Sequence, residues 1–343
     1  MYKGFVIDLS LLNSDPHLSQ GCTTCHKGDD KATDRTKAHS GLVKRPSDDP
    51  ELCAVCHPDV AANYSLSLHY TTAGFKNGVR PRFSESEAAI YDKKVFEQSC
   101  RSCHASCGDC HVKSPTISGV DIGLLSGHKF VRKDEAKTCA LCHGGRVYPE
   151  FNGDYGGNAD VHYQKGMSCV DCHKAAGLHG NGVAYPDMRA VAEKPTCVGC
   201  HPAGAEASDK AKQAHAVHGD KVSCSACHSS AEYRGCSSCH LGEGATDAPM
   251  FVLGRNPRMP GQLTTLRLVP TVRDTFAKAG IAQANYDAVQ NLWDSVPHNT
   301  KKRTDRTRDC ATCHDQQAHF LTVDSLPVGG AEANKALIFN FRK

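Results

Sequence analysis

The chain has 343 residues, a formal net charge of +3 and an apolar content of 39%, and aromatic residues make up only 6%. No run approaches the roughly eighteen consecutive apolar residues of a membrane-spanning helix, so the sequence predicts no membrane span. With 30 glycines and 16 prolines, long regular elements are not expected.

Four elements outside the cysteine motifs are expected, taken from the N-terminus onward. Residues 5–12 are apolar enough to form a short strand. Residues 205–218 are rich in Ala, Lys, Glu and Gln and predict a helix that ends at Gly219. Residues 282–296 carry apolar side chains at helical spacing before a proline, which predicts an amphipathic helix. Residues 336–341 predict a terminal strand.

All twenty cysteines follow one pattern. They form ten Cys-x-x-Cys pairs, and a histidine follows each pair directly. Numbered 1 to 10 in chain order, the motifs consist of Cys22, Cys25 and His26; Cys53, Cys56 and His57; Cys100, Cys103 and His104; Cys107, Cys110 and His111; Cys139, Cys142 and His143; Cys169, Cys172 and His173; Cys197, Cys200 and His201; Cys224, Cys227 and His228; Cys236, Cys239 and His240; and Cys310, Cys313 and His314.

This spacing suits covalent attachment of haem. Two thiols three positions apart can form thioether bonds to the two vinyl groups of one haem, and the next histidine can bind its iron. Zinc sites and disulfides also use Cys-x-x-Cys pairs, but neither requires a histidine at the following position ten times over. We therefore expect ten covalently bound c-type haems, with the motif histidines as proximal ligands.

In these motifs, which span Cys22 to His314, the sequence resembles a multihaem c-type cytochrome, here a decahaem one. The resemblance implies electron transport through haem iron. It extends to electron-transfer cytochromes of the periplasm and the cell exterior, including the subunits of cytochrome filaments, which share this haem density.

Ten further histidines lie outside the motifs and predict the distal ligands. They are His17, His39, His69, His128, His162, His179, His215, His218, His298 and His319. Their number equals the number of irons that need a second axial ligand, whereas the five methionines are too few. We expect ten bis-histidine, low-spin haems of low reduction potential. For any one of these histidines, a solvent-facing or hydrogen-bonded role is the alternative.

The density of motifs also limits how much regular structure the chain can form. About 34 residues per haem are too few to wrap each haem in its own protein core. We expect mostly coil with short α-helices and few small strands, around haems that replace a conventional hydrophobic core. Motif spacing predicts an N-terminal segment with four haems (1–116), a central segment with five (117–245) and a C-terminal segment with one haem and a strand-like tail (246–343).

Saturated coordination favours electron transfer over catalysis. A multihaem reductase needs an iron with an open position, and no Cys-x-x-Cys-Lys motif is present, so the reductase is the alternative hypothesis. The short spacing between two of the motifs supports electron transfer between haems. Cys103 and Cys107 belong to different motifs but are joined by at most about 14 Å of extended chain. Haems in contact would pass electrons along the chain.

Charge and maturation indicate the partners and the location. Ten haems with ionised propionates would bring the assembled charge to about −7 when oxidised, which argues against nucleic acid as a partner. We expect other redox proteins, extracellular acceptors or further copies of the chain, with His17 or His319 as a possible ligand across a junction. Because haem is attached outside the cytoplasmic membrane, the protein is expected to be exported, either to the periplasm or to the cell exterior.

Overall fold

The computed structural model describes residues 9–113, 116–117, 120–121, 129–130, 135–154, 159–202, 208–231, 251–269, 271–327 and 329–340. Its contacts divide the chain into two compact units. The first comprises Met1–Thr72, Cys103–Thr138 and Lys174–Tyr185, and the second comprises Ala73–Ser102, Cys139–His173 and Pro186–Lys343. Each unit is therefore assembled from three pieces of chain. The division into segments 1–116, 117–245 and 246–343 follows motif density along the chain and stays a prediction.

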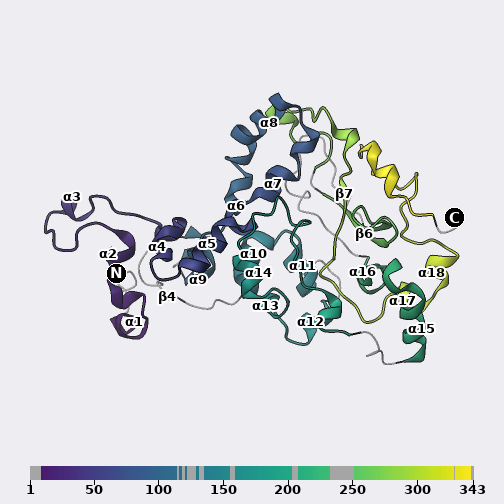
Figure 1. Ribbon diagram of the computed structural model, residues 1–343, viewed down its shortest axis with the longest axis horizontal. Helices are drawn as coiled ribbons and strands as arrows, with labels where there is room; N and C mark the ends of the chain where they lie inside the picture. Colours follow the sequence, from purple (N-terminus) through teal and green to yellow (C-terminus); the bar gives the residue numbers. More distant parts are fainter. Residues whose placement is uncertain are drawn as a thin grey trace. The chain divides into compact units, whose positions relative to one another are not determined.

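Short helices dominate the first unit (Figure 1). Pro50 and Pro58 lie in the first turns of two of them, and the side chains of Asp34 and Ser67 accept hydrogen bonds from backbone amides at the starts of two others. The helices are α1 (Leu9–Ser14), α2 (Cys22–His26), α3 (Arg35–Ala38), α4 (Pro50–Ala54), α5 (Pro58–Leu66), α6 (Leu68–Thr71), α9 (Cys107–His111) and α14 (Ala175–His179). Two strand pairs accompany them, β1 (Val112–Lys113) with β4 (Lys129–Phe130) and β2 (Thr116–Ile117) with β3 (Val120–Asp121).

The first unit has very little apolar core. Among its described residues, the buried apolar side chains are Pro50, Ala61 and Tyr64. The Tyr64 hydroxyl donates a hydrogen bond to the Ala105 carbonyl at 2.6 Å, and its ring packs edge-on against Tyr70. Burial of so few apolar side chains cannot offset the conformational entropy of ordering the unit. This agrees with the expectation that the chain lacks a conventional hydrophobic core here.

The second unit contains a three-stranded antiparallel sheet. Its strands are β5 (Val252–Arg255), β6 (Leu263–Leu268) and β7 (Leu292–Asp294), with β6 in the centre. Successive side chains of a strand point to opposite faces, and both faces are covered. One face packs Val252, Leu266 and Leu292 against Leu321 and Leu337, and the other packs Leu253 and Leu263 against Ala226 and Phe320.

A third apolar cluster in the second unit joins the region around α8 (Glu85–Ile90) to residue Ile281. Ser84 and Glu87 form a capping box at the start of α8. The same Glu87 carboxylate accepts hydrogen bonds from the amides of Ala282 (2.8 Å) and Ala284 (3.1 Å). One buried carboxylate thus caps the helix and fixes a segment that is distant in sequence.

The remaining helices are also short. In the second unit they are α7 (Ala73–Asn77), α8, α11 (Val147–Asn152), α12 (Val161–Gln164), α13 (Cys169–Cys172), α15 (Asp209–His218), α16 (Cys224–His228), α17 (Asp305–Arg308) and α18 (Ala311–His314), and α10 (Glu135–His143) runs from the first unit into the second. Single 3-10 turns lie at Leu18–Gln20, Pro46–Asp48, Arg80–Arg82, Cys100–Cys103, Cys197–Gly199, Gly219–Lys221, Ala277–Ala279, Tyr286–Ala288 and Glu332–Leu337, and a π-helical turn at Tyr91–Phe96. Within the described ranges, no helix combines the length and the apolar character needed to cross a membrane.

The predicted fold class, short helices and small strands in a chain that is mostly coil, is confirmed. The helix expected at residues 205–218 is confirmed where it is described, as α15. The helix expected at 282–296 is wrong: its apolar residues form a 3-10 turn and β7, because Leu292 is fully buried in the sheet beside β6.

Both terminal strands are also wrong where they are described. Residues 9–12 belong to α1, whose leucines are strong helix formers. At the other end, Glu332–Leu337 forms a 3-10 turn that places Leu337 in the apolar cluster on one face of the sheet. An apolar run does not by itself distinguish a strand from a turn that anchors one side chain.

The stability of the second unit should depend strongly on the buried side chain of Leu292 in its sheet. We expect Leu292→Ala to lower the free energy of unfolding by about 2–5 kcal/mol, because it leaves a cavity at a position with 0% exposure. Chemical denaturation of the haem-loaded protein measures this. Val296→Ala, at a side chain 62% exposed, is the control and should change stability by about 0.5 kcal/mol or less. Equal unfolding midpoints for the two variants would contradict the assignment of Leu292 to a core.

Candidate metal centres

Each of the nine described motifs forms a helical turn. In several of them the histidine amide donates to the carbonyl of the first cysteine, at 2.9 Å in motif 2, 2.8 Å in motifs 6 and 7, and 3.0 Å in motif 10. A helical turn brings residues i, i+3 and i+4 to one side. None of the eighteen described cysteines is in a disulfide. Each motif therefore offers two thiols and one imidazole on the same side of a turn.

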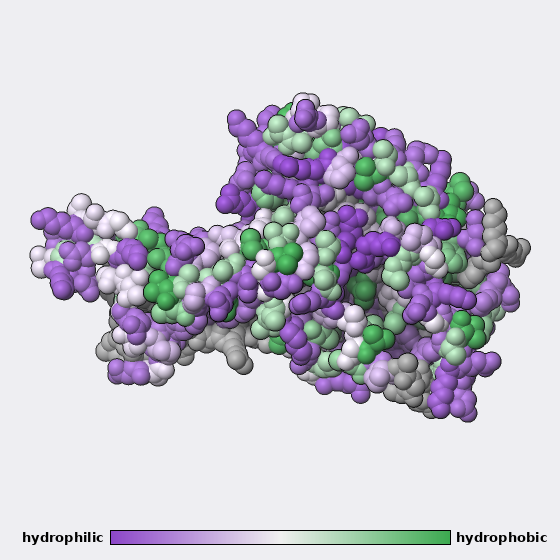
Figure 2. All heavy atoms as spheres, in the orientation of Figure 1, coloured by the Kyte–Doolittle hydropathy of each residue, from purple (hydrophilic) through white to green (hydrophobic). Residues whose placement is uncertain are grey.

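Spacer positions between the cysteines differ in burial: Ala226 of motif 8 packs in an apolar cluster of the sheet, whereas other apolar spacers are exposed. Val55, Leu141 and Val198 lie between paired cysteines and are 83%, 79% and 65% exposed. On the face drawn in Figure 2, hydrophobic residues likewise form small groups among hydrophilic ones. At the motifs with exposed spacers, the sequence requirement thus falls on the thiols and the imidazole.

The structure brings six motif histidines together with six histidines from outside the motifs. The ring centres are separated by 6.1 Å for His57 and His17, 5.9 Å for His111 and His179, 6.3 Å for His173 and His298, 6.0 Å for His201 and His162, 6.2 Å for His228 and His215, and 6.1 Å for His314 and His218. Each pair joins one motif histidine to one other histidine. Each pair also lies within a single unit.

This separation suits a metal ion between the two rings. An imidazole nitrogen binds a metal at about 2.0 Å, and the nitrogen lies about 1.1 Å from the ring centre. Two imidazoles on opposite sides of one iron would therefore have centres about 6.2 Å apart, close to all six separations. With two thiols beside one ring of each pair, the residues fit a covalently attached haem with two histidine ligands.

Hydrogen bonds orient several of these rings. Nδ1 contacts a backbone carbonyl oxygen in His26 (Val43, 2.8 Å), His218 (Ala214, 2.8 Å), His228 (Lys301, 3.1 Å) and His104 (Tyr70). When Nδ1 donates its proton to such a carbonyl, Nε2 is the nitrogen that carries a lone pair for a metal. The backbone around these histidines thus favours the tautomer that metal binding needs.

Two distal candidates instead have a carboxylate at Nδ1, and sequence reasoning missed both carboxylates. Asp15 Oδ1 lies 3.0 Å from His17 Nδ1, and Asp160 Oδ1 lies 2.8 Å from His162 Nδ1. The same oxygens accept hydrogen bonds from the backbone amides of the two histidines, at 2.9 and 2.7 Å. Both cases follow the pattern Asp-x-His, which is visible in the sequence. A carboxylate in this position increases the donor strength of the imidazole.

His298 has different surroundings. Its backbone amide donates to Glu150 Oε2 at 3.0 Å, whereas its Nδ1 is buried and has no hydrogen-bond partner among the described residues. Burial, followed by the nearby charge of Arg146, lowers the pKa of His298 to about 3. Burial also lowers the pKa of His173. Both rings are therefore neutral near pH 7, which is the form that binds a metal.

One helix, α15, carries two of the distal candidates. The Ser208 hydroxyl caps its start by accepting the amide of Ala211 at 3.3 Å, and Gly219 follows its last residue. His215 lies beside His228 of motif 8, and His218 lies beside His314 of motif 10. The positions of His215 and His218 on α15 are therefore compatible with the prediction that one helix provides ligands to two haems.

Eight of the predicted ligand histidines lie outside these six pairs. Motif histidines His26, His104 and His143 and the distal candidates His39, His69 and His319 are described, whereas Cys236, Cys239, His240 and His128 lie outside the described residues. The Asp29 amide donates to Ala38 O at 3.0 Å and the Val43 amide to His26 O at 2.7 Å, which brings the loop of His39 beside motif 1. The Ala105 amide donates to His69 O at 3.0 Å, beside motif 3. His319 Nε2 lies 3.1 Å from Asp305 Oδ2.

Cysteines of different motifs also meet. A side-chain hydrogen bond with Cys107 lowers the pKa of Cys53 to about 7, and one with Cys197 lowers the pKa of Cys224 to about 6. Motif 2 therefore touches motif 4 in the first unit, and motif 7 touches motif 8 in the second.

Weaker electrostatic contacts extend both series. Burial and then the charge of Cys53 raise the pKa of Cys25, which places motif 1 near motif 2. Burial and then Cys227 raise the pKa of Cys313 to about 11, which places motif 8 near motif 10. Cys172 adds to the raised pKa of Cys197, after its hydrogen bond with Cys224 and burial, which places motif 6 near motif 7.

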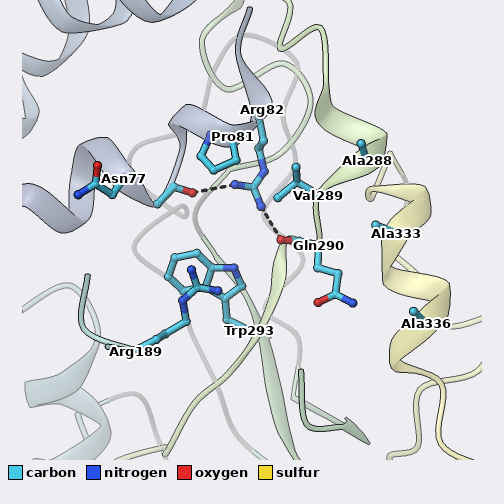
Figure 3. A pocket seen from close by; sticks show the side chains of 11 residues that line it. Asn77, Pro81, Arg82, Arg189, Ala288, Val289, Gln290, Trp293, Ala333 and Ala336 are labelled. Carbon is cyan, nitrogen blue, oxygen red and sulfur yellow. Dashed lines mark hydrogen bonds between the residues drawn. The ribbon is translucent and has the colours of Figure 1, made fainter. Parts of the chain in front are cut away.

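A cavity of about 370 Å³ in the second unit lies apart from these centres (Figure 3). The buried guanidinium of Arg82 donates to Gly78 O at 2.7 Å and to Gln290 O at 2.5 Å, and burial lowers its pKa to about 10. Arg189 stacks 3.8 Å above the ring of Trp293. No motif cysteine or histidine is among the described residues that line this cavity.

Comparison with known proteins agrees with the chemistry of the motifs. Residues 161–241 match the family model described as Cytochrome c3. These residues contain motifs 6 to 9. No curated protein and no solved structure matches the chain. The chain is thus similar to cytochrome c3 over this stretch, which supports a multihaem c-type cytochrome with covalently attached haem and a role in electron transfer.

Proposed function

We propose that the chain binds ten c-type haems, each between two histidines, and conducts electrons through them. The observation that carries this proposal is the set of six histidine pairs, each with one motif histidine and with ring centres 5.9–6.3 Å apart. When bound, the haems supply one-electron redox chemistry. The polypeptide supplies both axial ligands and the attachment points.

The pairs assign six distal ligands. His17, His179, His298, His162, His215 and His218 serve motifs 2, 4, 6, 7, 8 and 10, in that order. Four motif histidines then remain without an assigned distal ligand, and four distal candidates remain to provide one. The motif histidines are His26, His104, His143 and His240, and the distal candidates are His39, His69, His128 and His319. His39 is proposed for motif 1, because hydrogen bonds hold its loop beside His26.

Contacts between motif cysteines suggest the order of the haems. In the first unit the series is motif 1, motif 2 and motif 4, and in the second it is motif 6, motif 7, motif 8 and motif 10. A thioether attached at each of two touching cysteines brings two porphyrin edges together. Electron tunnelling falls off exponentially with edge-to-edge distance, so these series form conducting paths.

The proposed ligand set favours a role as an exported electron-transfer protein. Covalent haem attachment takes place outside the cytoplasmic membrane, which places the proposed site of action in the periplasm or at the cell exterior, in respiratory electron transfer. The proposed partners are other redox proteins and extracellular acceptors. His17 lies beside His57 of the same chain, so its proposed role is ligation within one chain rather than across a junction.

The two histidines of α15 provide a direct test of ligation. We expect His215→Ala and His218→Ala each to convert one haem in ten from low-spin to high-spin, because each substitution leaves a motif histidine as the single axial ligand. The double variant should convert two. Electron paramagnetic resonance counts the high-spin iron, and the haem content measured after pyridine treatment should stay at ten. Gln213→Ala, an exposed change on the same helix, is the control. A double variant with no more high-spin iron than the single variants would contradict the assignment.

The reductase alternative predicts an open iron. We expect the wild-type protein to form no fast adduct with carbon monoxide or cyanide, because both axial positions of every iron are occupied by protein. Absorbance spectroscopy of the reduced and oxidised protein before and after addition measures this. A rapid high-spin or ligand-bound fraction near one haem in ten would favour a catalytic haem.

Copies of the chain are the remaining candidate partner. We expect purified, haem-loaded protein to appear as separate particles by electron microscopy, since His17 has a partner ring in its own chain. Filaments that are lost in His319→Ala, with the haem content unchanged, would instead assign His319 to a haem of a neighbouring copy.

A further inference from the structure

The histidine pairs of motifs 6 and 7 differ in what contacts the distal ring. His162, the partner of motif 7, has a carboxylate at Nδ1, whereas Nδ1 of His298, the partner of motif 6, has no hydrogen-bond partner among the described residues. The two pairs are neighbours, because Thr300, two residues after His298, exchanges hydrogen bonds with Asp160 and Val161, which directly precede His162. Adjacent centres with unlike surroundings are expected to have unlike affinities for an electron.

Asp160 is held rigidly against His162. Only 2% of Asp160 is exposed. Its Oδ1 accepts from the amide of His162 at 2.7 Å and contacts the ring Nδ1 at 2.8 Å, and its Oδ2 accepts from the amide of Thr300 at 2.6 Å. Thr300 O in turn accepts from the Val161 amide at 3.0 Å. The carboxylate cannot turn away from the ring without breaking hydrogen bonds to two segments of the chain.

A buried carboxylate at Nδ1 stabilises positive charge on the ring and on any metal that the ring binds. It draws the Nδ1 proton toward itself, which strengthens the imidazole as an electron donor and favours ferric over ferrous iron. Low exposure preserves the effect, because solvent does not screen the charge.

The surroundings of His298 act in the opposite direction. The nearby Glu150 carboxylate is paired with Arg146, whose Nε lies 3.0 Å from Glu150 Oε1. The carboxylate also accepts from the backbone amide of His298 rather than from its ring. A ring without an acceptor at Nδ1 is a weaker donor, which favours the ferrous state.

We propose that Asp160 is a positioning residue that creates a step in reduction potential between the two neighbouring centres, with the His162–His201 centre at the lower potential and the His173–His298 centre at the higher. This rests on the proposed function. Haems held by the two pairs would pass one electron from the His162–His201 centre to the His173–His298 centre, with no proton or group transferred. The step gives electron flow through this part of the chain a preferred direction.

Asp15 makes the same contact with the ring of His17, at a site that is more exposed to solvent. Its Oδ1 lies 3.0 Å from Nδ1 of His17, but the two side chains are 15% and 44% exposed, against 3% and 30% for Asp160 and His162. Solvent screens its charge more strongly. Its influence on the His17–His57 centre is therefore smaller than that of Asp160 on its own centre.

The test is a potentiometric titration of the full-length, haem-loaded protein, followed by absorbance. Asp160→Asn removes the charge and keeps the shape of the side chain. We expect a component of about one tenth of the absorbance change to move from the low-potential end of the curve to higher potential. Asp15→Asn should move another tenth by less, and Asp160→Glu should lie closer to wild type than Asp160→Asn. Asp209→Asn, which removes a fully exposed carboxylate, is the control and should leave the curve unchanged.

Each other outcome overturns the proposal. A curve for Asp160→Asn that superimposes on wild type, or a shift that arises from the high-potential end, shows that Asp160 does not set the lower potential. Loss of low-spin iron in Asp160→Asn, or the same shift in Asp160→Glu, shows that Asp160 only holds the ring in place. Haem content and low-spin character of the wild type are measured first, because failure there concerns the proposed function and not the potential step.

Discussion

The spacing between paired imidazole rings constrains the rest of the chain. A motif histidine is placed by its own helical turn, but its partner comes from a distant segment, as His298 does for His173 and His218 for His314. Bringing such rings to about 6 Å requires loops, caps and turns to be positioned around each pair. Each bis-histidine centre would then act as a cross-link between segments, which explains how many short helices can be held together with little regular structure between them.

The two units differ in the interactions that stabilise them. The first has three buried apolar side chains among its described residues, so its order depends on the proposed haems far more than on apolar burial. The second adds a sheet covered on both faces by apolar clusters. Ser229, which follows motif 8, and Thr300, two residues after His298, form an isolated β-bridge. His298 follows β7 by four residues, so the sheet helps to position this distal candidate.

Chains that use the same two ligands at every iron must vary the surroundings of the ligands to vary the potentials. Here the Nδ1 contacts fall into three classes, which are a backbone carbonyl, a carboxylate, and no partner among the described residues. These contacts act on the donor strength of the imidazole without changing its identity. A conduit built this way keeps all irons closed to small ligands while its centres differ in electron affinity.

The sequence by itself predicted the chemistry: each Cys-x-x-Cys-His motif uses contiguous residues, so the proposed attachment points, proximal ligands and pool of distal histidines follow from the sequence alone. It also predicted short helices and α15. Only the tertiary structure decided which distal histidine meets which motif, because that pairing joins residues far apart in sequence. The same reason overturned the helix expected at 282–296, where pairing of β7 with β6 outweighed helical periodicity. The Asp-x-His pattern was visible, but only folding shows that the carboxylate of Asp160 contacts the ring and is shielded from water.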